Sequence, residues 1–70
     1  MLARSSRGER VKELQLILIT QGYFPGPPSG FYDARTEESV MLFQKEHNLT
    51  ISGTVNRETE CLIYKLQKNV

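Results

Sequence analysis

An internal repeat limits what this 70-residue chain can fold into. The segment from Ser29 to Lys45, SGFYDARTEESVMLFQK, returns in weaker form from Ser52 to Lys68, SGTVNRETECLIYKLQK. Matching positions hold identical or similar residues: Ser29 and Ser52, Gly30 and Gly53, Asp33 and Asn56, Thr36 and Thr59, Glu37 and Glu60, Val40 and Ile63, Phe43 and Leu66, Gln44 and Gln67. A third echo, Val11, Leu14 and Gln15, precedes both copies. The pattern predicts three related helices, the last two each preceded by a glycine turn.

Start and stop signals bound each helix. Asp33 and Asn56 are suitable N-caps, because their side chains can accept hydrogen bonds from the free N–H groups of the first turn. Gly22 and Asn48 are suitable left-handed residues just beyond a helix end. Apolar residues at helical spacing then predict an all-α, compact three-helix bundle with an internal repeat and no sheet. The expected helices cover about residues 9–21, 34–47 and 57–68.

Length and composition favour one domain over residues 8–70, with residues 1–7 as a flexible terminus or linker. The one cysteine, Cys61, excludes an internal disulfide framework. No apolar run is long enough to span a membrane, so we expect no membrane insertion and a monomer, with any export signal outside this chain. The net charge of +1, with both signs interspersed, argues against a nucleic-acid partner. A DNA-reading third helix is disfavoured further, because Glu58 and Glu60 offset Arg57 and Lys65.

Catalytic and metal-binding patterns are weak. His47 has no cluster of further metal ligands around it, and its expected position faces away from Cys61. Glu37 and Glu38 are adjacent, so on a helix they diverge and cannot act as a converging carboxylate pair. We therefore predict no catalytic residues, no metal and no cofactor.

The loop between the first two helices concentrates aromatic residues. YFPGPPSG, residues 23–30, cannot continue a helix because of its prolines, and Phe31 and Tyr32 follow directly. Such aromatics either cover the end of a small core or offer flat surfaces to sugars or peptides. Tyr32 is assigned mainly to the core, whereas Tyr23, Phe24 and Phe31 stay open.

The repeated glutamines, Gln15, Gln44 and Gln67, lie beside the apolar stripes. A buried amide left unpaired costs about 1–3 kcal/mol, so these side chains should bond to backbone near a loop or a helix end. Bracing of this kind is the favoured interpretation, and ligand contact is the alternative.

Taken in order, several short motifs resemble those of the small peptidoglycan-binding domain attached to many cell-wall hydrolases. They are Val11-x-x-Leu14-Gln15, Gly22-Tyr23, Ser29-Gly30-x-Tyr32-x-x-x-Thr36, Val40-x-x-Phe43-Gln44 and Asn48-Leu49. The match covers about residues 8–66, and the order and spacing of the motifs are more specific than any motif alone. The chain departs from the family pattern at Ser29, where the family usually has Asp, at Asp33 and Asn56, where it often has Gly, and at Asn48, which replaces a Gly.

The resemblance implies a three-helix fold and a non-catalytic module that binds peptidoglycan in the cell wall or periplasm and targets a covalently linked hydrolase. The bound moiety is expected to be glycan or stem peptide. The candidate ligand-binding residues are Tyr23, Phe24, Phe31, Tyr32, Arg35 and Gln44. The alternative function is a protein-interaction or pro-region module that docks a catalytic domain through Leu16 and Ile19.

Overall fold

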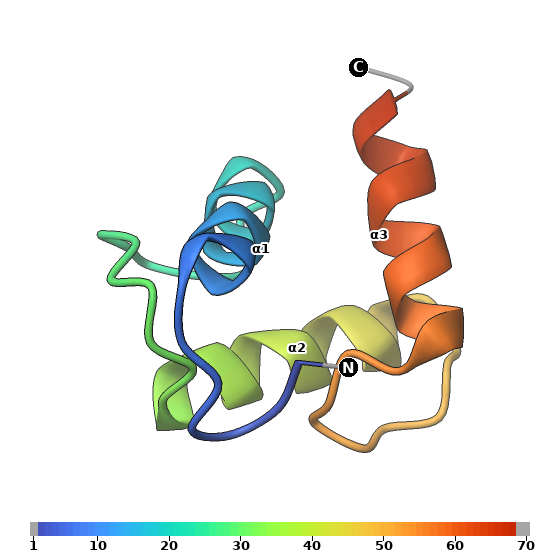
Figure 1. Ribbon diagram of the computed structural model, residues 1–70. Coiled ribbons are helices and arrows are strands. Elements are labelled where there is room, and N and C mark those ends of the chain that lie inside the picture. The colour runs from blue at the N-terminus through green and yellow to red at the C-terminus, as the bar shows by residue number, and fades with distance from the viewer. Residues whose placement is uncertain (1, 69–70) are drawn as a thin grey trace.

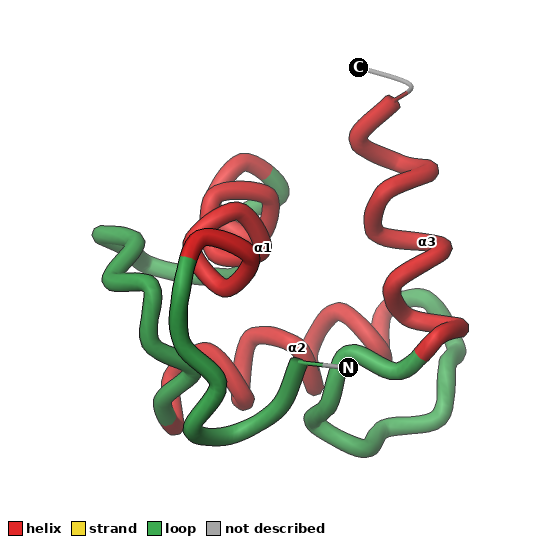
Figure 2. The backbone as a smooth tube through the Cα atoms, in the orientation of Figure 1, coloured by secondary structure: helices red, strands yellow, loops and turns green. Residues whose placement is uncertain are grey.

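Three helices connected by irregular loops make up the fold. The computed structural model describes the backbone of residues 2–68 and the side chains of residues 2–66. The helices are α1 (Glu9–Thr20), α2 (Ala34–Glu46) and α3 (Arg57–Lys68), and no strand occurs within the described residues (Figure 2). The predicted all-α class is confirmed, and each predicted boundary lies within one residue of the observed one.

The helices cross one another rather than running parallel. In Figure 1, α2 forms the base of the molecule, and α1 and α3 lie above it and apart from each other. The loop over residues 21–33 links α1 to α2 on one side, and the loop over residues 47–56 links α2 to α3 on the other. The repeated sequence thus produces two similar units: α1, its loop and α2 form the first, and α2, its loop and α3 form the second.

A small core fills the space between the helices. Its members are fully or almost fully buried: Val11, Leu14, Ile17, Leu18, Phe24, Tyr32, Val40, Phe43, Val55 and Ile63. Most apolar residues of the predicted stripes are among them, although Leu62 and Leu66 of α3 are only partly buried. Ile17 was not expected from the spacing of Val11, Leu14 and Leu18. Ile17 lies on the side of α1 that carries Glu13, which bonds to Tyr64 of α3, and the spacing of the other buried residues alone does not reveal this second buried side.

The first two helices end in the same way. Gly22 (φ 86°) and Asn48 (φ 58°) both have the left-handed conformation. After α1, Gly22 N–H donates to Ile19 O and Tyr23 N–H to Leu18 O; after α2, Asn48 N–H donates to Lys45 O and Leu49 N–H to Gln44 O. These paired bonds form a Schellman motif at each end, which satisfies carbonyls that the helix leaves open.

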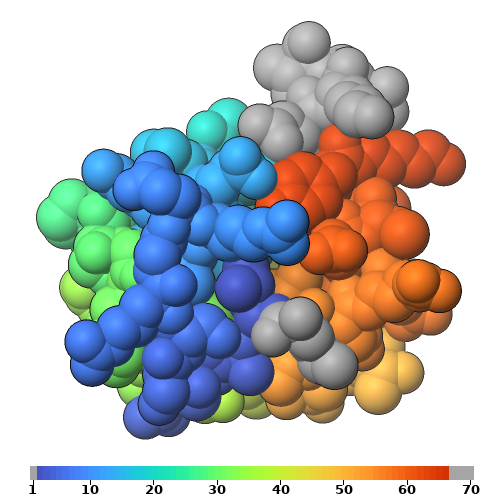
Figure 3. All heavy atoms as spheres, in the orientation of Figure 1, coloured from blue at the N-terminus to red at the C-terminus, as the bar shows by residue number. Residues whose placement is uncertain are grey.

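The N-terminal segment, residues 2–7, lies against the domain. Val55 N–H donates to Leu2 O. Ser5 N–H donates to Tyr32 O, and Tyr32 N–H donates to Ser6 O. Figure 3 shows this segment running across the face of the molecule beside the chain that precedes α3. Residues 2–7, expected to form a flexible terminus or linker, thus supply backbone partners for both loops; Met1 lies outside the described residues.

No helix in the described part of the chain is long and apolar enough to cross a membrane.

Candidate functional site

Gln15 joins α1 to the turn and helix that follow it. Its Oε1 accepts from Gly30 N–H at 2.9 Å, and its Nε2 donates to Phe31 O at 3.0 Å and to Thr36 Oγ1 at 2.8 Å. The side chain is fully buried, so these bonds replace the water that its amide would otherwise bind.

Gln44 makes the same set of contacts one unit later. Its Oε1 accepts from Ser52 N–H and Gly53 N–H, both at 3.0 Å, and its Nε2 donates to Thr54 O and Thr59 Oγ1, both at 2.9 Å. Like Gln15, it is fully buried. Gln44 is therefore a brace, and the burial of its amide does not favour the expected role in ligand contact.

The turn glycines make this arrangement possible. Gly30 (φ 80°) and Gly53 (φ 78°) adopt a left-handed conformation that other residues rarely adopt. A Cβ at Gly53 would lie 3.0 Å from Glu37 Cγ, so the Glu37 side chain would also have to shift to admit a side chain there. The side chain of Gln67, the third member of the series, lies outside the described residues.

Two of the predicted aromatic ligands are core residues. Tyr32 is fully buried, and its hydroxyl donates to Gly53 O at 2.6 Å, which ties the first turn to the second. Burial, with a smaller contribution from the Glu37 carboxylate, raises the pKa of Tyr32 and keeps its hydroxyl a donor. Phe24 is 4% exposed and belongs to the same core. Phe24 and Tyr32 were expected to contact a ligand, but both rings are buried in this structure and neither is presented at the surface.

Phe31 lies apart from the other loop aromatics. Its ring is partly exposed beneath the Arg7 guanidinium, whose Cζ is 4.9 Å from the ring centroid. The backbones of Arg7 and Phe31 also pair in an isolated bridge. A cation–π contact of this kind fixes the N-terminal segment to the loop.

A hollow between the loop over residues 21–33 and α2 is lined by the two remaining candidates, Tyr23 and Arg35. We call it the Arg35 hollow; it has a volume of about 210 Å³ and is lined by Tyr23, Pro25, Arg35, Glu38, Ser39 and Leu42. Tyr23 and Arg35 were expected from the sequence. Pro25, Glu38, Ser39 and Leu42 were missed, although three of them follow Arg35 at helical spacing on one side of α2, a signal that the sequence did contain.

Contacts with Phe24 and Asp33 position the Arg35 side chain. Its Cζ lies 5.7 Å from the centroid of the buried Phe24 ring, and its Nε is 3.9 Å from Asp33 Oδ2. The side chain remains 57% exposed, so its outer N–H groups are open to a ligand. Phe24 thus contributes to the hollow by supporting the guanidinium.

Asp33 fixes the start of α2 next to this hollow. Its Oδ1 accepts from both the N–H and the Oγ1 of Thr36. These bonds, led by the one from Thr36 N–H, outweigh desolvation and lower the pKa of the Asp33 carboxyl. The cap therefore stays ionised at neutral pH and occupies the N-terminal N–H group that a ligand anion would otherwise bind.

The comparison with known proteins decides the family. A model of the "putative peptidoglycan binding domain" matches residues 7–60, which is more than half of the chain. The chain belongs to this family of peptidoglycan-binding domains.

Two solved structures share the fold of this peptidoglycan-binding domain. The crystal structure of the SleB N-terminal domain has a TM-score of 0.90 and 28% sequence identity, over 93% of this chain and 89% of that one. The crystal structure of the Burkholderia AP3 phage endolysin has a TM-score of 0.83 and 31% identity, over 89% of this chain but only 24% of the endolysin.

The departures from the family pattern keep its geometry. Ser29 Oγ accepts from Phe31 N–H at 3.3 Å and so still shapes the turn. Asp33 and Asn56 each accept from the N–H of a Thr three residues on, and Asn48 takes the left-handed φ that a glycine would take. These substitutions preserve the fold because short polar side chains tolerate caps and left-handed positions.

The remaining sequence candidates for chemistry or docking are separated. His47 stacks on Phe43, with ring centroids 4.2 Å apart, and its Nδ1 lies 2.9 Å from Phe43 O. Cys61 is exposed, and no group of three or more potential metal ligands occurs among the described residues. Leu16 is 48% exposed, but Ile19 packs against the core beneath the loop at Gly26. The docking surface expected from Leu16 and Ile19 therefore shrinks to Leu16.

Proposed function

We propose that this domain binds peptidoglycan without modifying it and keeps a covalently linked hydrolase at the cell wall, outside the cytoplasm. Membership of the family supports the ligand. The endolysin, of which a domain of this kind covers 24%, supports the presence of a further domain in the full protein.

The Arg35 hollow is the binding site that we propose, and the exposed, supported guanidinium is the observation that carries it. A guanidinium can bind a carboxylate with two parallel hydrogen bonds, and stem peptides end in carboxylates. The apolar surfaces of Tyr23, Pro25 and Leu42 surround this charge and suit the methyl groups of a peptide or the face of a sugar. Glu38 adds an acceptor for peptide N–H or sugar hydroxyl groups, whereas the Ser39 hydroxyl is buried and donates to Arg35 O.

Sedimentation with purified, insoluble peptidoglycan tests the proposal. Arg35→Gln removes the charge, and Leu42→Gln removes apolar surface; both residues are exposed, so both variants should fold. We expect Arg35→Gln to weaken binding about tenfold or more, since a charge-assisted hydrogen bond contributes about 1.5–3 kcal/mol. Arg57→Gln, an equal loss of charge at an exposed position on α3, is the control and should bind like the wild type.

Two results would count against this function or this site. Undiminished binding by both folded hollow variants would place the site elsewhere. Failure of the wild-type domain to sediment with the wall would contradict peptidoglycan binding itself and would favour docking of a catalytic domain through a surface that includes Leu16.

A further inference from the structure

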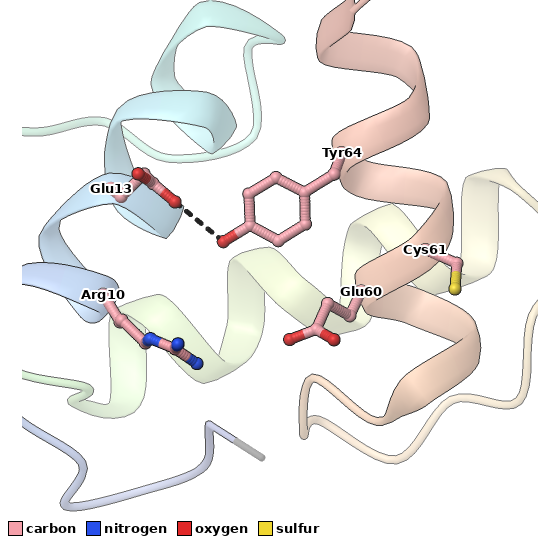
Figure 4. A pocket seen from close by; sticks show the side chains of 5 residues that line it. All are labelled: Arg10, Glu13, Glu60, Cys61 and Tyr64. Carbon is pink, nitrogen blue, oxygen red and sulfur yellow. Dashed lines mark hydrogen bonds between the residues drawn. The ribbon is translucent and has the colours of Figure 1, made fainter.

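A second concave surface lies between α1 and α3, away from the Arg35 hollow. We call it the α1–α3 cleft; it has a volume of about 600 Å³ and is lined by Arg10, Glu13, Glu60, Cys61 and Tyr64. It shares no lining residue with the Arg35 hollow. Figure 4 shows Arg10 and Glu13 of α1 and Glu60 and Tyr64 of α3 projecting toward the space between the two helices, whereas the Cys61 side chain points away from α1.

The cleft contains charges of both signs that are not paired with each other. The two ion pairs of the described residues join Arg4 to Glu37 and Arg35 to Asp33, so none joins Arg10 to Glu13 or Glu60. The one hydrogen bond drawn within the cleft runs from the Tyr64 hydroxyl to Glu13 Oε1, at 2.9 Å (Figure 4). Arg10 and Glu60 therefore keep their hydrogen-bonding capacity for a ligand.

Tyr64 makes this cleft an ordered surface. Burial and the bond to Glu13 raise the pKa of Tyr64 to about 12, so its hydroxyl stays protonated and fixes one Glu13 oxygen at neutral pH. The second Glu13 oxygen and both Glu60 oxygens remain available as acceptors. The ring of Tyr64 also supplies an apolar wall on which a cation can rest.

We propose that the α1–α3 cleft binds a zwitterionic amino-acid end, in which an ammonium and a carboxylate share one carbon. Arg10 receives the carboxylate, and Glu13 and Glu60 receive the ammonium, whose three donors need acceptors on more than one side. In peptidoglycan this group occurs at the free side-chain end of a diamino acid in an uncrosslinked stem peptide. The inference rests on the proposed function for its biological ligand, but its recognition chemistry can be measured without the wall.

The opposite charges argue for this ligand over simpler ones. A plain cation would leave Arg10 without a partner, and a plain anion would face repulsion from two carboxylates. A neutral sugar would leave Arg10 and Glu60 without a partner of opposite charge. A zwitterion satisfies both signs at once, and the volume of the cleft accommodates an amino acid with part of its peptide.

The test is a titration of the isotope-labelled domain followed by amide NMR shifts. The probe is free diaminopimelic acid, which carries two zwitterionic ends, and the control probe is its doubly N-acetylated form, which lacks both ammonium groups. We expect the free acid to shift amides of Arg10, Glu13, Glu60 and Tyr64, and the acetylated acid to bind at least about tenfold more weakly. Equal shifts with both probes, or no shift in the cleft, would overturn the proposal.

Variants separate a specific site from general charge attraction. Glu60→Gln and Arg10→Gln should each weaken the probe about tenfold, whereas Glu58→Gln, the same change at an exposed neighbouring position of α3, should not. Equal weakening by Glu58→Gln would overturn the site. Tyr64→Phe should weaken the probe less than Glu60→Gln, because it only frees Glu13; a larger effect would also contradict these assignments.

The outcome is distinguishable from that of the proposed function. If the domain sediments with the wall but the probe shifts no amides of the cleft, the result supports the proposed function and contradicts this second site. If the domain binds the probe in the cleft but does not sediment with the wall, the result supports the proposed binding chemistry of the cleft and contradicts peptidoglycan as its ligand.

Discussion

At the scale of single residues, two related side chains, an aspartate and an asparagine, serve as N-caps at equivalent positions in the repeat. Asp33 and Asn56 each accept a bond from the N–H group of a Thr three residues on, at 3.0 and 2.9 Å. Only Asp33 is ionisable, and its pKa is lowered chiefly by the bond from Thr36 N–H. The two caps should therefore contribute similarly at neutral pH and differently in acid.

Asp33→Ala should reduce the free energy of unfolding by about 1 kcal/mol, and Asn56→Ala by a similar amount, since each loses one cap. Asp33→Asn should stay close to the wild type at pH 7, because asparagine caps as well as aspartate. Urea unfolding of the three variants measures these differences. A silent Asn56→Ala beside an unfolded Asp33→Ala would show that the two positions are not equivalent.

The Asp33 cap should also make the free energy of unfolding depend on pH. Because the folded pKa of Asp33 lies below its ordinary value of 3.8, the unfolded state takes up the proton first as the pH falls. The stabilisation is thus complete above that ordinary value and is lost as the pH falls through the folded value. Asp33→Asn should lose less stability than the wild type over this range, and identical acid unfolding curves would contradict the assignment.

At the scale of elements, the glutamine brace organises each turn. Each glutamine bonds to backbone groups of the turn and to the Thr hydroxyl in the following helix, and no described buried side-chain polar atom lacks a partner. A single amide thus determines how one helix meets the next loop. This explains why the repeat keeps the Gln, the Gly and the Thr together.

Gln44→Met should cost about 2–4 kcal/mol, because it keeps the volume but leaves the N–H groups of Ser52 and Gly53 without their side-chain acceptor and removes a donor from the Thr54 carbonyl. Gln15→Met should have a comparable effect. Lys45→Met, at an exposed position on the same helix, is the control and should change stability by less than about 0.5 kcal/mol. Urea unfolding gives the costs, and hydrogen exchange at the Gly53 amide should accelerate in Gln44→Met. Equal stability of the Gln44 and Lys45 variants would mean that other contacts fix the turn.

At the scale of the whole molecule, one small core connects all three helices and both loops. Phe43 is fully buried near its centre, edge-on to Tyr23 with centroids 5.7 Å apart and stacked on His47. Total stability in a domain of this kind is only about 5–15 kcal/mol, so one emptied aromatic site is a large fraction of it.

Phe43→Ala should cost about 3–5 kcal/mol through lost burial and the cavity that remains. Met41→Ala, at a position of α2 that is 41% exposed, provides the control and should change the melting temperature little. Thermal unfolding followed by circular dichroism compares the two. A Phe43→Ala melting temperature near that of the wild type would show that the core does not depend on this ring.

The local features of this protein were determined by the sequence itself. Helix limits, caps at Asp33 and Asn56, turns at Gly30 and Gly53, and bracing by Gln15 and Gln44 could all be predicted, because each depends on residues close in the chain or on a repeated spacing. The resemblance to a family rested on the same spacing.

Only the tertiary structure decided which loop residues face outward. Phe24 and Phe31 look alike in the sequence, yet Phe24 is buried under the Arg35 guanidinium, and Phe31 lies at the surface beneath Arg7. An irregular loop has no period that assigns its side chains to a face, so their burial depends on which distant segment covers them. The same holds for the α1–α3 cleft, whose charges come from helices that are far apart in the chain and are brought together by the fold, with a direct bond from Tyr64 to Glu13.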